Sequence, residues 1–110
     1  MNIRVEGYIW GPPVVGIEIR NKNDEKIEVE WVRMEWPPEN IFHKKLDLDG
    51  AVIWDDGNPG PPTWATSLKG NRYINGDSSK PLVGVFSTAF PGSYEMEVGF
   101  TNGCVVYGNP

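Results

Sequence analysis

The residue types that most often carry catalysis are scarce in this chain. Among 110 residues there is one histidine, His43, and one cysteine, Cys104. A Ser-His-Asp or Cys-His arrangement would have to use His43, which stands in a polar stretch beside two lysines, so we expect an exposed loop histidine. The glutamates of the strand-like segments alternate with apolar residues, which is typical of a solvent-facing sheet surface rather than a glycosidase cleft. The sequence therefore predicts a protein that is not an enzyme and carries no cofactor.

Four aspartates in two neighbouring turns are the candidates for metal binding. The first two belong to an Asp-Leu-Asp-Gly run with the form of an EF-hand fragment, but the first ligand position would then be Lys45, which cannot bind calcium. Aspartate is also common in turns because it tolerates the left-handed backbone region. We therefore expect solvated turns and no metal, with a calcium site as the alternative. The four residues are Asp47, Asp49, Asp55 and Asp56.

The five tryptophans are a heavy load for a chain of this length. Trp31 continues an apolar strand face, so we expect it in the core. Trp36, Trp54 and Trp64 adjoin proline-rich loops, where they either plug the ends of the domain or form an exposed platform. Flat apolar rings beside Asp and Asn suit the face and rim of a sugar ring, and they suit a protein partner equally well. These three tryptophans are the candidate ligand platform.

The N-terminal segment, residues 1–10, is a self-contained strand pattern that ends at Gly-Pro-Pro. Ile3 and Val5 fall on one face of the alternation, and Tyr8 and Trp10 fall on the other. Such a strand either pairs within its own sheet or is donated to the edge of a neighbouring subunit. Alongside an ordinary first strand, we therefore hold the hypothesis of a subunit interface at Ile3, Val5, Tyr8 and Trp10.

The charge of the chain excludes several classes of partner. Its formal net charge is −5, and its lysines and arginines are scattered. No basic stripe follows a phosphate backbone, so we expect no nucleic-acid partner, and an anionic membrane surface is equally unfavourable. The longest apolar run is far shorter than a spanning helix, so we expect no membrane insertion. Met1 is followed directly by the strand pattern, so we expect the targeting segment to be absent from this chain.

The periodicity throughout the chain predicts an all-β fold. Short alternating segments are separated by turn signals about every ten residues. Asp49-Gly50 and Asn102-Gly103 predict two-residue hairpins. In residues 26–36 the alternation changes phase near Trp31, which predicts a β-bulge or a strand that bends between sheets. We expect one antiparallel β-sandwich domain over residues 1–110, with about seven to nine strands.

A spaced pattern from Ile17 to Val106 resembles a known group of domains. It comprises IEIRNKNDEKIEVEWVRMEWP, LDLDGAVIW, a Pro-Pro loop with Trp64, Arg72 and Ile74 before a Gly turn, Leu82 to Phe86, YEMEVGF and NGC. The pattern resembles the small Ig-like, fibronectin-like sandwich domains of bacterial surface and pilin-like proteins.

This resemblance implies an Ig-like fold, an extracellular or cell-surface location and a structural role. In such domains the cysteine near the end tends to have a partner near the first strand. Residues 1–10 hold no cysteine, so a disulfide of Cys104 would need another chain. A looser likeness to cellulose-binding sandwich modules rests on tryptophans and glycine-rich turns.

Two functions are therefore kept. The first is a non-catalytic, self-associating module of an extracellular surface assembly, such as a filament or pilus subunit, whose partners are copies of itself or other surface proteins. The alternative is a carbohydrate-binding module that takes a polysaccharide on exposed tryptophans.

Overall fold

Residues 2–110, which the computed structural model describes, form ten strands and one short 3-10 helix joined by tight turns. This is more strands than the expected seven to nine, because two very short strands form in the loop-rich segment before β8. The elements are β1 (Ile3–Gly11), β2 (Val14–Asn21), β3 (Ile27–Glu35), η1 (Pro38–Asn40), β4 (His43–Leu48), β5 (Ala51–Trp54), β6 (Thr63–Ala65), β7 (Tyr73–Ile74), β8 (Ser78–Phe86), β9 (Glu95–Phe100) and β10 (Val105–Gly108).

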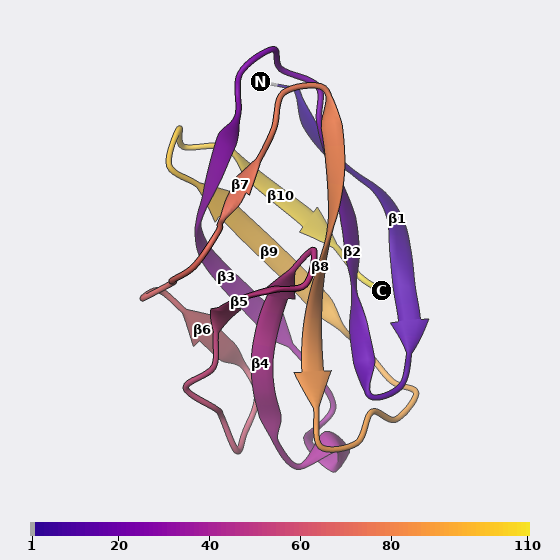
Figure 1. Cartoon of the computed structure of the whole chain (residues 1–110). Coiled ribbons are helices and arrows are strands. Elements are labelled where there is room, and N and C mark those ends of the chain that lie inside the picture. The colour runs from indigo at the N-terminus through magenta and orange to yellow at the C-terminus, as the bar shows by residue number, and fades with distance from the viewer. Residues whose placement is uncertain (1) are drawn as a thin grey trace.

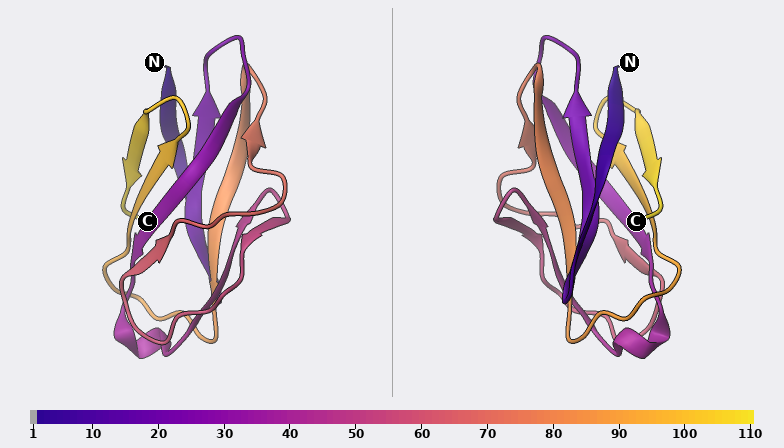
Figure 2. Two further views of the ribbon diagram at one scale, coloured as in Figure 1. Left: turned by 90° about the vertical axis from the view of Figure 1, so that its left-hand side faces the viewer. Right: turned by 90° about the vertical axis from the view of Figure 1, so that its right-hand side faces the viewer.

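The strands make two sheets that pack face to face, as the predicted sandwich requires (Figure 1). The first sheet has the order β1-β2-β8-β4-β5. The second has the order β10-β9-β3-β6, and β7 also pairs with β3. The side views show β1 and β10 at the same side of the two layers (Figure 2). These paired strands run antiparallel.

The core lies between the two sheets and takes residues from both. Side chains alternate along each strand, so every second apolar residue points inward and loses its contact with water. Burial of such side chains is the main favourable term in folding, about 25 cal/mol per Å² of apolar surface. The fully buried core includes Val15, Ile17, Ile19, Val29, Val32, Met34, Leu46, Leu48, Ile53, Leu82, Phe86, Met96 and Val98.

Register shifts in β1 and β3 determine which side chains of these two strands face outward. The pairing of β3 with β9 shifts register between Val29 and Trp31, so of the two alternatives indicated by the change of phase, the bulge is the one that forms. The pairing of β1 with β2 shifts between Val5 and Gly7. This second bulge was not predicted. It places Tyr8 opposite the buried Ile17, so Tyr8 and Trp10 lie on the same face of β1 as Ile3 and Val5, and the expected opposite faces are wrong.

The two hairpin turns form where they were predicted. Asp49 and Gly50 both have positive φ, 51° and 85°, as a two-residue type I′ turn requires. The second hairpin has a three-residue loop rather than the expected two. Gly103 N–H donates to the Phe100 carbonyl and Phe100 N–H donates to the Cys104 carbonyl, both at 2.9 Å, and Gly103 alone in the loop has positive φ. This is a type I turn followed by a glycine bulge.

Residues 2–110 contain no helix with the length and apolarity needed to cross a membrane. Cys104 is 6% exposed and its thiol is free, so it occupies the place of a small core residue at the start of the last strand segment.

Candidate binding surfaces

The outer strand of the first sheet, β1, has a long free edge. Lys22 N–H donates to the Asn2 carbonyl at 2.7 Å, which sets the phase of the hydrogen bonds between β1 and β2. Antiparallel pairs alternate between bonded and unbonded residues. Because Asn2 belongs to a bonded pair, Ile3 and Val5 belong to unbonded pairs, and beyond the bulge the same holds for Tyr8 and Trp10. The backbone groups of these four residues therefore point away from β2.

The side chains of the same four residues point toward the gap between the sheets at its open side. Ile3 and Val5 pack against the core, while Tyr8 and Trp10 remain 58% and 49% exposed. The Trp10 ring meets Tyr94 edge-to-face, with centroids 5.8 Å apart. A shallow apolar groove of about 270 Å³ adjoins it, lined by Trp10, Pro91, Gly92, Tyr94 and Pro110.

β1 differs in length from the other outer strands. It has nine residues, whereas β5 and β10 have four each and β6 has three. Short edge strands are one way in which proteins prevent pairing with other chains. Within residues 2–110 no second strand pairs with β1. It is therefore the edge best suited to accept a further strand.

The structure does not support a platform of three exposed tryptophans. Trp36 and Trp54 are 3% and 6% exposed, so this part of the expectation is wrong, and Trp64 alone of the three is open to solvent, at 58%. Trp36 is held inside because its Nε1–H donates to Thr63 Oγ1 at 2.9 Å. Trp54 packs against His43 with ring centroids 5.0 Å apart. These two indoles fill the proline-rich end of the core.

His43 is fully buried, and the expectation of an exposed loop histidine is wrong. It begins β4 opposite Phe86, and the two rings stack with centroids 4.5 Å apart at 20°. Thr63 Oγ1 accepts hydrogen bonds from Trp36 Nε1 and Asn58 Nδ2 and lies 2.7 Å from His43 Nδ1. Because its two lone pairs are then occupied, the Thr63 hydroxyl donates its proton to Nδ1.

This arrangement keeps His43 neutral, with its own proton on Nε2. Nε2 has no hydrogen-bond partner among residues 2–110. Burial lowers the pKa of His43 to about 4, and the Lys45 backbone offsets part of that effect. The ring is sealed from solvent, so this cluster stabilises the fold and does not present a catalytic group to a substrate.

The outer face of the second sheet carries an aromatic pair that no linear pattern brings together, the exposed Trp64 and the half-buried Trp31. The bulge in β3 turns Trp31 outward, although it was expected in the core, and its indole lies 5.7 Å from that of Trp64. Arg33 lies over the Trp64 ring at 5.8 Å. The change of phase near Trp31 was the signal in the sequence that this ring faces outward, because a bulge moves the residues beyond it to the opposite face.

The acidic turns do not converge on a metal site. Residues 2–110 contain no group of three or more His, Cys, Asp or Glu side chains arranged to hold a metal ion, so the described residues give the calcium alternative no support. Asp47 lies 3.5 Å from the Lys45 ammonium, and Asp55 pairs with Lys69 at 2.8 Å. In each region one lysine thus pairs with one of the two aspartates.

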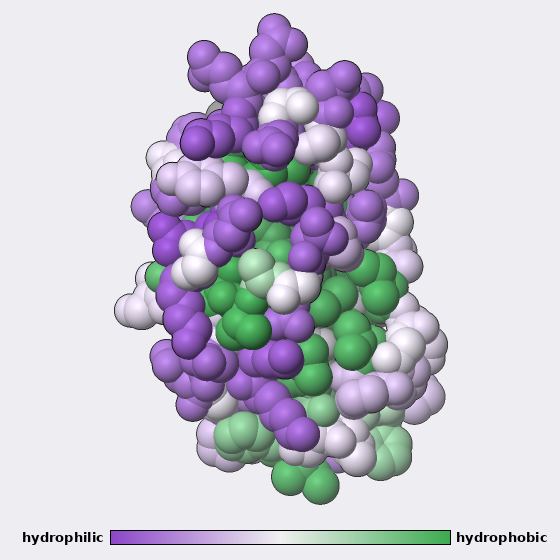
Figure 3. Space-filling model, viewed as in Figure 1, coloured by the Kyte–Doolittle hydropathy of each residue, from purple (hydrophilic) through white to green (hydrophobic). Residues whose placement is uncertain are grey.

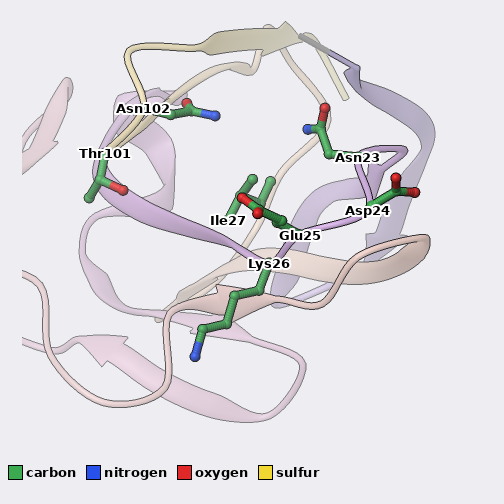
Figure 4. A pocket seen from close by; sticks show the side chains of 7 residues that line it. All are labelled: Asn23, Asp24, Glu25, Lys26, Ile27, Thr101 and Asn102. Atoms are coloured by element: carbon green, nitrogen blue, oxygen red, sulfur yellow. The ribbon is translucent and has the colours of Figure 1, made fainter.

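A polar hollow of about 450 Å³ lies at the end of the sandwich away from η1, where the β2–β3 loop faces the β9–β10 turn (Figure 4). Its charged side chains, Asp24, Glu25 and Lys26, are exposed and point in different directions. They do not form a site for a charged ligand.

The outer face of the first sheet has a band of partly exposed apolar residues near its middle (Figure 3). The register across β1, β2 and β8 places Ile9 and Val83 on either side of Gly16, which has no side chain. The band is thus continuous with β1. It consists of Ile9, Val14, Val52, Val83 and Val85.

Comparison with known proteins supports the fold. No family model matches the chain, and no curated protein matches it. Among solved structures, the archaellum periplasmic stator protein FlaG from Sulfolobus acidocaldarius is similar over 99% of this chain and 98% of its own. The TM-score is 0.58 and the sequence identity is 11%. The chain therefore shares the all-β fold of that protein, and the identity is too low to carry its activity across.

Proposed function

We propose that this protein is a non-catalytic structural module that associates with copies of itself through the free edge of β1, in an assembly at the cell envelope or surface. The observation that carries the proposal is the nine-residue outer strand whose backbone groups at Ile3, Val5, Tyr8 and Trp10 point away from its sheet. Strand addition at such an edge supplies a row of main-chain hydrogen bonds.

Other features support the same role. Tyr8 and Trp10 beside this edge are exposed aromatic residues, the types that dominate the energetics of protein interfaces. The buried, neutral His43 leaves the chain's single imidazole without access to a substrate. The similar fold of an archaellum periplasmic stator protein supports a location in the envelope and a place within a larger assembly.

The test separates backbone pairing from side-chain contact at one position. The Tyr8 N–H is on the free edge, so Tyr8→Pro removes a donor that the fold does not use, while Tyr8→Ala removes the ring and keeps the donor. Light scattering and electron microscopy over a range of concentrations should show association of the wild type. Tyr8→Pro should abolish it and Tyr8→Ala should weaken it less.

Trp64→Ala is the matched control, because Trp64 is as exposed as Tyr8, at 58%, but lies on the other sheet. It should associate like the wild type. Circular dichroism must show that each variant keeps its strands. A wild-type chain that remains monomeric at every concentration, or a folded Tyr8→Pro variant that associates normally, would contradict the proposal.

A further inference from the structure

The outer face of the second sheet carries a row of side chains that crosses β6, β3, β9 and β10. The registers place Trp64 opposite Arg33, Arg33 opposite Glu97, and Glu97 opposite Tyr107. Aromatic rings thus stand at both ends of the row and a charged pair stands between them. Three strand spacings separate the ends, or about 14 Å, which is enough for a short oligosaccharide.

Trp31 broadens the aromatic surface next to this row. It pairs with Gly99, and a Cβ at that position would overlap the Trp31 indole, so the ring covers the bare backbone of β9. Trp31 and Trp64 lie side by side, with centroids 5.7 Å apart and planes tilted by 38°. Within residues 2–110 the buried Trp36 donates its indole N–H to Thr63, whereas the Trp64 ring is open to solvent.

The polar groups between the rings are held in place. Arg33 Nε donates to Glu97 Oε1 at 2.6 Å, and its Nη1 donates to Glu35 Oε1 at 3.2 Å. The Tyr107 hydroxyl donates to Glu95 Oε1 at 2.7 Å. Side chains fixed in this way lose little conformational freedom when they accept or donate a further hydrogen bond, so the cost of binding is reduced.

From this arrangement we propose that the face formed by Trp31, Trp64, Arg33, Glu97 and Tyr107 binds a neutral glycan. A pyranose ring has an apolar face that stacks on an indole and a rim of hydroxyls that fits the carboxylate and guanidinium groups. In this row the charged residues lie in the middle and the aromatic rings at the ends. Protein–protein interfaces are arranged the other way, with charged residues depleted at the centre and polar groups at the rim.

The charge of this face also selects the class of glycan. Three carboxylates, those of Glu35, Glu95 and Glu97, stand against the single guanidinium of Arg33. Their excess negative charge repels uronic-acid and sulfated polymers, whereas it does not oppose a neutral chain. The bound species is thus expected to be uncharged.

Tryptophan fluorescence provides the test on the intact chain. We would titrate it with cellohexaose, xylohexaose, maltohexaose, chitohexaose and a soluble mannan, with alginate as the charged comparison. At least one neutral probe should shift the emission and saturate, and alginate should not. Trp64→Ala should weaken that binding about 30-fold, the effect typical of truncating an aromatic anchor.

Tyr8→Ala is the matched control, because it removes an equally exposed ring from the other sheet. It should bind the glycan like the wild type. If no neutral probe binds, if alginate binds as tightly, or if Trp64→Ala binds normally, the proposal is wrong. If Trp64→Ala instead disrupts self-association and no glycan binds, this face is a protein interface. Failure of the β1 proposal would appear in the Tyr8→Pro experiment and would leave glycan binding unchanged.

Discussion

Acidification from about pH 7.5 to about pH 5 should destabilise the fold, because the folded chain holds His43 as a neutral ring. The ring lies between Phe86, Trp36 and Trp54 and has no contact with solvent. Its Nδ1 is occupied by the Thr63 hydroxyl. A protonated imidazole would be a buried cation with no carboxylate beside it, and the unfolded chain would hydrate that charge freely.

The two pKa values determine the size of the effect. In the unfolded chain the pKa of His43 is near the ordinary value of 6.5, and in the folded chain burial lowers it to about 4. Between these values the unfolded state binds more protons, so stability falls as the pH falls through that window. The loss is about 2 kcal/mol at pH 5 and about 3 kcal/mol below pH 4. Above pH 6.5 the contribution is fully present.

Urea unfolding followed by tryptophan fluorescence at both pH values measures this loss. A change of 2 kcal/mol moves the midpoint by roughly 1 to 2 M urea. The control is His43→Asn, whose side-chain oxygen can accept the Thr63 hydroxyl but does not titrate. It should be less stable at both pH values, because the stack on Phe86 is lost. Its difference between the two pH values should be about 2 kcal/mol smaller than that of the wild type.

Two results would refute the reasoning. One is an equal loss of stability in wild type and His43→Asn, since the titrating group would then lie elsewhere. The other is an NMR titration of the folded protein that gives His43 a pKa near 6.5, because the ring would then be accessible to water.

Three further outcomes follow from single contacts. Thr63→Val should lower the free energy of unfolding by about 3 kcal/mol, because the buried Trp36 N–H loses its acceptor, and Thr63→Ser should restore most of it in the same urea assay. Gly99→Ala should displace Trp31, shift its fluorescence and cost about 1–3 kcal/mol, and an unchanged spectrum would contradict the placement of the ring. Calcium or EDTA should leave the thermal midpoint unchanged, and a rise with calcium would show that the acidic turns do converge.

Local periodicity in the sequence was sufficient to predict the all-β class, both hairpins and the bulge in β3. Each of these depends on residues that are neighbours in the chain. The Asp49-Gly50 turn forms because both positions adopt positive φ, and the change of phase at Trp31 is visible because side chains alternate along a strand. The apolar edge residues Ile3, Val5, Tyr8 and Trp10 could also be named, although their shared face could not.

Tertiary structure alone decided which aromatic rings are buried. Trp36, Trp54 and Trp64 all adjoin proline-rich loops, and no local signal separates the two that pack around His43 from the one that faces solvent. Burial depends on how distant strands meet: Thr63 supplies the acceptor for Trp36, and Phe86 the stacking surface for His43. For the same reason the row from Trp64 to Tyr107, which joins four strands through register, exists in the folded sheet and has no counterpart in the linear pattern.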